Sequence, residues 1–202
     1  MKFYPGHTYH VYNQGNNRQQ LFFERENYFY FLEKIRNGLV PFCDILAWCL
    51  MPNHFHLLIT IHEDYVHEKA IQNKEKVVNP LNRQIGIIQS SYSKGINKRY
   101  NRSGSLFRQN TKAKSLTEQN RNKMDTAVNC FFYIHQNPLK ARLVEKMEDW
   151  EFSSFRDYVG LRNGDLCKKD LAKDLFNLPS NSDEFYDLSY QTISDQVVSK
   201  LY

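Results

Sequence analysis

The order in which strand-like and helix-like patterns follow one another is the feature of this sequence that most limits its fold. Stretches that alternate every second residue are separated by stretches with apolar residues at helical spacing, in the order β-α-β-β-α-β, followed by one more helix. That order predicts an α+β ferredoxin-like sandwich with a central antiparallel sheet. The predicted elements are strands over 7–13, 43–51, 54–61 and, more weakly, 112–116, and helices over about 27–39, from about 81 to an end near 101–104, and over about 118–136.

The last part of the chain has a different character. Residues 161–202 are polar and acidic, with scattered apolar side chains and no strand pattern. We therefore expect one domain over 1–160 and a peripheral helical appendage over 161–202.

Composition excludes several classes of protein. Hydrophobic residues make up 41% and charged residues 24% of 202 residues, which is typical of a globular chain and too apolar for a disordered one. The most apolar stretch, 43–61, is interrupted by Asp44, Asn53 and two histidines, so it does not predict a membrane span. Because the first ten residues lack an apolar signal core, we expect a cytoplasmic protein. The four cysteines form no CxxC pair, which predicts buried reduced thiols rather than a zinc ribbon.

Charge is divided unevenly along the chain. Residues 1–144 contain 20 basic and 10 acidic side chains, whereas residues 145–202 contain 7 and 12. The stretch 79–117 has eight lysines and arginines and no acidic residue, with aromatic side chains among them. Such a block suits a polyanion, because lysine and arginine neutralise phosphates and aromatic rings stack on unpaired bases. A solvated basic helix face is the alternative.

Two histidines give the clearest candidate for chemistry. Alternation along 54–61 sends His54 and His56 to one face of a strand and the apolar residues between them to the other. Two imidazoles one pleat apart can hold one metal ion, although an ordinary histidine pair is the more frequent meaning of this pattern. Tyr133 and Asn137 share a helix face four residues apart, and Pro138 predicts that the helix ends there. Alone, Tyr133 is typical of a packed aromatic residue.

Five sequence motifs together carry a resemblance that none of them carries alone. They occur in order over about residues 7–160, and together they resemble the HUH-type single-tyrosine transposases, most closely the REP-associated tyrosine transposases. The motifs are HV at 10–11 with GNNRQ at 15–19, LMPNHFHLL at 50–58, YNRSGSLF at 100–107, YIHQNPLKA at 133–141, and WEFSSFRDY at 150–158.

The resemblance implies a role for each candidate residue. His54 and His56 would be the two histidines of the HUH motif, Asn137 a third metal ligand, and Tyr133 the nucleophile that forms a 5′-phosphotyrosine. The cofactor would be magnesium or manganese. The added helix that carries Tyr133 would be the catalytic helix, and the activity would be cutting and rejoining of single-stranded DNA.

The expected partner is single-stranded or hairpin DNA, held by basic and amide side chains. The sequence leaves open whether the protein is a monomer or a homodimer. The residues expected to contact DNA are Asn16, Asn17, Arg18, Lys94, Lys98, Arg99, Arg102, Arg108 and Lys112.

Two other functions remain open at this point. The chain could be a domesticated nucleic-acid-binding protein without turnover, or a phosphohydrolase that uses metal-bound water while Tyr133 only packs. A second histidine and acidic cluster over 62–68 is typical of a solvated loop, and His10 and His135 are expected to be structural.

Overall fold

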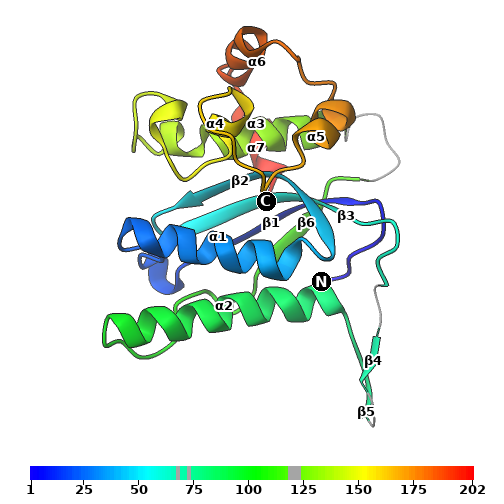
Figure 1. Ribbon diagram of the computed structural model, residues 1–202, viewed down its shortest axis with the longest axis vertical. Coiled ribbons are helices and arrows are strands. Elements are labelled where there is room, and N and C mark those ends of the chain that lie inside the picture. The colour runs from blue at the N-terminus through cyan, green and yellow to red at the C-terminus, as the bar shows by residue number, and fades with distance from the viewer. Residues whose placement is uncertain (67–68, 72–73, 118–123) are drawn as a thin grey trace.

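A four-stranded antiparallel sheet forms the centre of the protein, in a computed structural model that describes residues 1–66, 69–71, 74–117 and 124–202 (Figure 1). The strand order is β2-β3-β1-β6, so β1 lies between β3 and β6. Strands and helices follow the predicted order β-α-β-β-α-β, which confirms the α+β ferredoxin-like fold. The strands are β1 (Thr8–Gln14), β2 (Cys43–Met51), β3 (His54–Ile61) and β6 (Lys112–Ser115).

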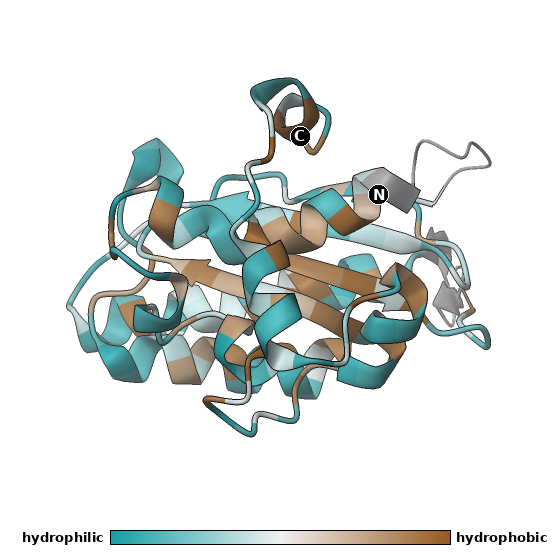
Figure 2. Ribbon diagram, turned by 90° about the horizontal axis from the view of Figure 1, so that it is seen from above, coloured by the Kyte–Doolittle hydropathy of each residue, from teal (hydrophilic) through white to brown (hydrophobic). Residues whose placement is uncertain are grey.

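One face of the sheet is covered by helices α1 (Arg25–Leu39) and α2 (Pro80–Arg99), which lie side by side below it in Figure 1. The side chain of Asn79 caps α2 by accepting a hydrogen bond from the backbone N–H of Asn82. The helices approach closely at Gly38, where a Cβ atom would lie 2.6 Å from Cδ1 of Ile88. Apolar residues of both helices face the sheet, as the spacing predicts, and Figure 2 shows the hydrophobic strands between more hydrophilic helix surfaces.

Strands β2 and β3 form a hairpin with the tight turn predicted at Pro52-Asn53, and Met51 pairs with His54. The alternation in β3 is as predicted. Phe55 lies against Phe31 of α1, with ring centroids 5.2 Å apart, whereas His56 points to the opposite face. Both faces are covered, so only 2% of His56 is exposed.

Helix α3 (Met124–Lys140) covers the other face and runs through Pro138, so the predicted end of this helix is wrong. Proline removes one backbone N–H. The side-chain amide of Asn137 donates to the carbonyl of Tyr133 at 2.8 Å, and the N–H of Ala141 donates to the carbonyl of Asn137. These bonds support the turns on both sides of Pro138. The predicted start of the helix, over 118–123, lies outside the described residues.

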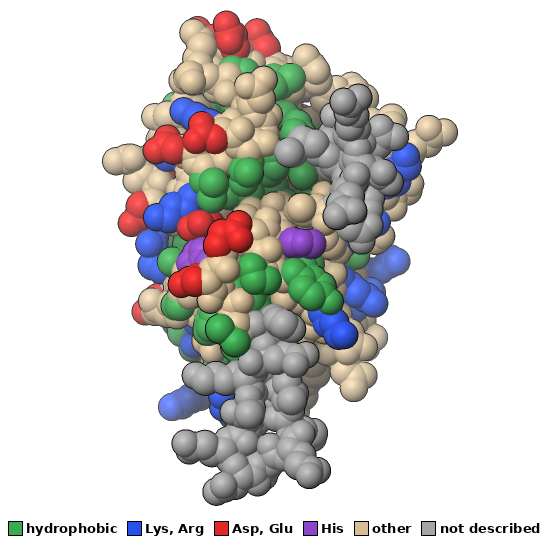
Figure 3. Space-filling model, turned by 90° about the vertical axis from the view of Figure 1, so that its right-hand side faces the viewer, with side chains coloured by type: hydrophobic (Ala, Val, Ile, Leu, Met, Phe, Trp, Pro, Cys, Tyr) green, Lys and Arg blue, Asp and Glu red, His purple; other side chains and the backbone are tan. Residues whose placement is uncertain are grey.

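The acidic segment after residue 160 is helical, as expected, but it is not peripheral. Its helices α5 (Lys169–Phe176), α6 (Ser182–Ser189) and α7 (Asp195–Ser199) all contact α3. Phe176, Phe185 and Leu201 belong to the same cluster of buried residues as the sheet. Each Å² of apolar surface that is buried stabilises the folded state by about 25 cal/mol. This gain favours docking of the segment despite its polar composition. Figure 3 shows acidic side chains at the upper end of one face, where α6 lies.

Smaller elements complete the fold. A hairpin of β4 and β5 between β3 and α2 was not predicted, because its short strands lie in a polar stretch. His67 and Glu68 of the predicted solvated loop lie outside the described residues, and Glu63 and Asp64 are exposed. All four cysteines are buried free thiols. Within the described residues, no helix is long and apolar enough to cross a membrane. The remaining bounds are β4 (Lys69–Ile71), β5 (Lys74–Val78), α4 (Phe155–Tyr158), and the 3-10 helices η1 (Asn16–Arg18) and η3 (Met147–Asp149).

Candidate active site

The two histidines of β3 lie at the hairpin end of the sheet, on the face toward α3. Their ring centroids are 5.0 Å apart. Nδ1 of His54 donates to Oδ1 of Asn53 at 2.7 Å, and Nδ2 of Asn53 donates to the backbone carbonyl of Arg18. The turn and the 15–19 loop therefore hold the ring of His54 in place.

Tyr133 approaches these histidines from α3. Its ring centroid lies 6.1 Å from that of His56, with the two rings nearly perpendicular. The structure therefore brings His56 and Tyr133, two of the residues singled out in the sequence, close to each other. Asn137 lies one turn further along α3, and its Nδ2 donates to the carbonyl of Tyr133, which leaves Oδ1 as the amide atom suited to a metal ion.

The histidines are suited to binding a divalent ion. Burial lowers the pKa of His54 to about 4 and that of His56 well below its usual value, so both rings are neutral near pH 7 and carry a nitrogen lone pair. Nε2 of His56 is buried and has no hydrogen-bond partner in the part of the chain that the structure describes. A buried, unpaired imidazole nitrogen is costly, and a metal ion would satisfy it. Among the residues that the structure describes, no three His, Cys, Asp or Glu side chains gather where they could hold a metal ion, at this site or elsewhere.

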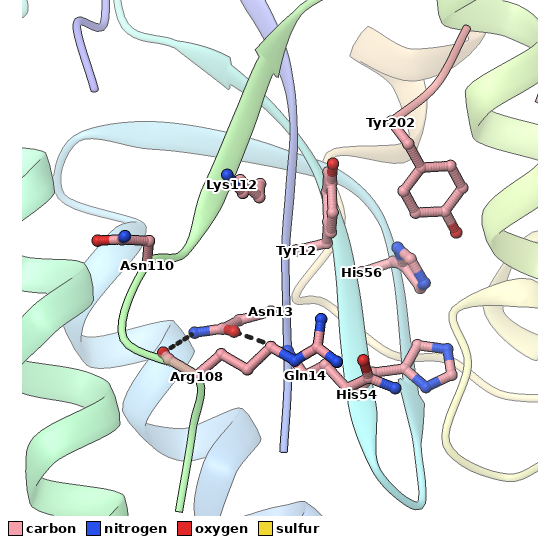
Figure 4. A pocket seen from close by; sticks show the side chains of 9 residues that line it. All are labelled: Tyr12, Asn13, Gln14, His54, His56, Arg108, Asn110, Lys112 and Tyr202. Atoms are coloured by element: carbon pink, nitrogen blue, oxygen red, sulfur yellow. Dashed lines mark hydrogen bonds between the residues drawn. The ribbon is translucent and has the colours of Figure 1, made fainter. Parts of the chain in front are cut away.

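A pocket of about 310 Å³ opens beside the histidines. Figure 4 shows His54, His56 and Tyr202 on one side of it and Arg108, Asn110 and Lys112 on the other. A phosphate in this pocket would meet imidazole nitrogens on one side and cationic side chains on the other.

The basic residues singled out in the sequence separate into two groups. Arg108 and Lys112 line the pocket. By contrast, α2, which carries Lys94, Lys98 and Arg99, packs on the opposite face of the sheet (Figure 1). The structure therefore does not bring these three residues to the histidines.

Two of the predicted DNA-contacting arginines already have partners within the chain. Arg99 forms an ion pair with Glu24 at 2.5 Å. Arg102 donates to Oε1 of Gln19, and its guanidinium lies 5.2 Å from the ring centre of Phe23. Arg102 therefore holds together the two loops that flank the β1 end.

The predicted loop residues lie close to the pocket. Asn16, Asn17 and Arg18 form η1 directly after β1, and Asn17 and Arg18 adopt left-handed φ values of 51° and 59°. The N–H of Asn16 donates to the carbonyl of Leu106. This loop therefore projects polar side chains at the same end of the sheet as His54, which pairs in register with Gln14.

Sequence reasoning missed Tyr202. Its hydroxyl lies 2.6 Å from the hydroxyl of Tyr133, and its ring contacts His56 and Tyr12. The chain brings it there because Leu201 is fully buried and because Nζ of Lys114 donates to the carbonyl of Tyr202. No local pattern in the acidic tail predicted this contact.

The hydroxyl of Tyr133 lies in a partly buried environment. Burial raises its pKa above the usual value of 10, and the hydrogen bond with Tyr202 acts in the opposite direction. Nζ of Lys140 lies 5.3 Å from the centre of the Tyr133 ring. At neutral pH the tyrosine is therefore a phenol, which must lose a proton to act as a nucleophile.

Comparison with solved structures, but not with protein-family models or curated proteins, finds proteins similar to this chain. No protein-family model matches the chain, and no curated protein matches it. Among solved structures, the chain is similar to a REP-associated tyrosine transposase bound to a REP hairpin, with a TM-score of 0.56 and 18% sequence identity, over 83% of this chain and 92% of that one. The likeness shows a shared fold, that of the same class of protein that the sequence motifs indicate.

Proposed function

We propose that this protein is a metal-dependent enzyme that cuts and rejoins single-stranded DNA through a covalent bond to Tyr133, as a transposase does. The observation that carries this proposal is the position of Tyr133 against His56, whose buried Nε2 has no partner. The shared fold with a transposase bound to a hairpin and the five sequence motifs support it independently.

The chain supplies the groups that this chemistry needs. The phenolic oxygen of Tyr133 attacks phosphorus and loses its proton, the bond to the 3′ oxygen breaks, and the DNA keeps a free 3′-hydroxyl while its 5′ phosphate is bound to the tyrosine. The phosphotyrosine retains the energy of the phosphodiester, so another 3′-hydroxyl can reverse the step. His54, His56 and Asn137 would hold magnesium or manganese, which supplies charge neutralisation at the nonbridging oxygens.

The pocket favours a single-stranded substrate next to a hairpin. Arg108 and Lys112 are suited to the phosphates, and the loop amides of Asn16 and Asn17 can read base edges that a duplex hides. The hairpin held by the transposase of similar fold supports the same partner.

A second candidate function is nucleic-acid binding without turnover. The hydrogen bond between Tyr133 and Tyr202 favours it, because Tyr133 is only 8% exposed and its hydroxyl already has a partner. For cleavage, Tyr202 must move or exchange this bond for one to the phosphate.

A covalent adduct distinguishes these functions. We expect wild-type protein with manganese and hairpin oligonucleotides carrying randomised single-stranded flanks to form an adduct that survives denaturing electrophoresis. A fluorophore at the 3′ end of the DNA should stay with the protein, whereas one at the 5′ end should not, because the 5′ phosphate is the attached group.

The matched variants are Tyr133→Phe and Tyr12→Phe. The first loses only the nucleophilic hydroxyl, so the adduct should disappear while DNA binding changes less than about threefold. Tyr12 is a neighbouring pocket tyrosine, and its variant should keep the adduct. Cleavage by Tyr133→Phe without an adduct would favour the water-using phosphohydrolase, and binding without cleavage by wild-type protein would favour the second candidate.

A further inference from the structure

A third histidine lies directly behind the candidate metal ligands. His10 is on β1, is fully buried, and faces the same side of the sheet as His56. Its Nε2 lies 2.9 Å from Nδ1 of His56, and its Nδ1 lies 2.9 Å from the backbone carbonyl oxygen of Leu201. The two imidazole rings are nearly coplanar, at 23°, as an in-plane hydrogen bond requires.

The donors and acceptors in this chain of two hydrogen bonds can be assigned by starting from the carbonyl of Leu201. A carbonyl oxygen can only accept, so Nδ1 of His10 carries a hydrogen and donates it to Leu201. In a neutral ring the other nitrogen then has a lone pair, so Nε2 of His10 accepts. Burial lowers the pKa of His10 to about 4, and the nearby Lys114 acts in the same direction, which is consistent with a neutral ring.

The same reasoning continues into His56. Because Nε2 of His10 accepts, Nδ1 of His56 must be the donor, and Nε2 of His56 keeps its lone pair. Among the described residues, this Nε2 has no hydrogen-bond partner. We propose that His10 is a positioning residue that, together with the carbonyl of Leu201, holds His56 in the Nδ1–H tautomer with Nε2 free to bind a divalent ion. The metal-binding part of this proposal rests on the proposed function.

His54 is held by the same kind of hydrogen-bond chain, in which Asn53 takes the place of His10. Nδ1 of His54 donates to Oδ1 of Asn53, whose Nδ2 is in turn fixed by the carbonyl of Arg18. Each imidazole thus donates from Nδ1 to an acceptor that is itself oriented by a backbone carbonyl. Such outer partners fix the tautomer and ring angle of metal-binding histidines, and their removal typically lowers metal affinity about 10- to 100-fold.

The arrangement also gives the end of the chain a part in the site. Leu201 is fully buried, and the N–H of Leu201 donates to the carbonyl of Val198 at the end of α7. The carbonyl that orients His10 is therefore positioned by docking of the acidic segment. Residues 8–14, 54–61 and 195–201 together determine which nitrogen of His56 is available.

Nitrogen NMR of the metal-free protein tests the tautomer directly. In protein labelled with ¹⁵N at histidine, long-range couplings to the ring hydrogens distinguish a protonated from an unprotonated ring nitrogen, and a spectrum of His56→Gln assigns the signals. We expect His56 at pH 7.5 to have a protonated Nδ1 and an unprotonated Nε2. The Nε2–H tautomer, or a mixture of the two, would overturn the proposal without need of any further variant.

Two variants of His10 test whether it is responsible. His10→Gln can accept from His56 with its carbonyl oxygen and donate to Leu201 with its amide, whereas His10→Leu fills space and can do neither. In His10→Leu we expect His56 to populate both neutral tautomers. Manganese binding, measured by calorimetry, should weaken about 10- to 100-fold. His10→Gln should keep most of the Nδ1–H tautomer of His56 and most of the manganese affinity. His7→Leu, at a histidine outside the pocket, is the control.

The outcomes separate this inference from the proposed function. If both His10 variants bind manganese as the wild type does and keep its His56 tautomer, His10 has no positioning role. Equal loss of manganese affinity in His10→Leu and His10→Gln, with the thermal unfolding temperature unchanged, would also contradict the positioning role. If the tautomer depends on His10 but wild-type protein forms no DNA adduct, the positioning role stands and the proposed cleavage activity fails.

Discussion

The two faces of the central sheet differ in what they bury. Toward α1 and α2, β3 presents Phe55 and Leu57, which pack against rings such as Phe31 and Phe107. Toward α3, the same strand presents His54 and His56, which meet further polar side chains. Two-residue alternation thus places the candidate chemistry on one face of the sheet, although the α3 side also buries an aromatic cluster around Phe131, Phe155 and Phe185.

The difference shows how this fold can tolerate costly groups. Burial of imidazole and phenol groups costs free energy unless each polar atom has a hydrogen-bond partner, and an unpaired nitrogen bears this cost in full. Aromatic clusters on both sides of the sheet supply compensation, because their rings bury large apolar areas. The following predictions test whether the two faces are as separate as the structure indicates.

The largest effect is expected from His54→Ala on the polar face. Loss of one imidazole should lower the rate of manganese-dependent adduct formation at least about 1,000-fold, because metal stabilisation of the developing charge amounts to several kcal/mol. Calorimetry should show weaker manganese binding, and urea unfolding should change little, since His54 is only partly buried. His62→Ala, just beyond the other end of β3, is the control, and wild-type manganese affinity in His54→Ala would remove His54 from the site.

The opposite result is expected from Phe31→Ala on the apolar face. Phe31 is 1% exposed and contacts the rings of Phe22, Phe55 and Tyr92. Its truncation should lower the free energy of unfolding by about 3–5 kcal/mol through reduced burial and a cavity. Manganese affinity of the folded fraction should stay within about twofold. A parallel decrease in metal affinity would show that the faces are coupled.

Acid should lower the stability of the folded protein through its buried histidines. Burial lowers the pKa of His10 and His54 to about 4 and that of His135 to about 3, below the unfolded value near 6.5. As pH falls below 6.5, the unfolded chain takes up protons that these folded histidines exclude, so stability decreases until about pH 4 for His10 and His54 and until about pH 3 for His135. Each such histidine contributes a slope of about 1.4 kcal/mol per pH unit. Urea unfolding at pH 7, 6 and 5 measures it, and His135→Gln should give a shallower slope.

The smallest effect concerns the basic residues. Arg108→Gln with Lys112→Gln should reduce the slope of log K for single-stranded DNA against log salt by about 0.7 for each phosphate that the protein no longer neutralises. Lys94→Gln with Lys98→Gln, on the far side of the sheet, removes the same charge and should change the slope less. Equal changes for the two pairs would mean that DNA extends around both faces.

Local pattern was enough to predict most elements of the fold and the candidates on them. Alternation over 54–61 placed His54 and His56 on one face, and helical spacing put Tyr133 and Asn137 on another element. These properties depend on neighbours within one strand or one helical turn, so the sequence by itself determines them.

Other features depended on contacts between distant parts of the chain. Helix α3 passes through Pro138 with Asn137 bonded to Tyr133, and α2 carries Lys94 and Lys98 away from the pocket. Neither follows from the local patterns that predicted a helix end at Pro138 and a basic block over 79–117.

The end of the chain shows the same limit most clearly. His10 was expected to be structural, yet it contacts both His56 and Leu201, and Tyr202 comes from a segment whose polar composition predicted a peripheral position. The hydrogen bond to Leu201 joins atoms 191 residues apart. Periodicity indicates which residues share a face, whereas which distant backbone carbonyl reaches an imidazole is decided only by tertiary packing, because burial of Leu201 fixes that position.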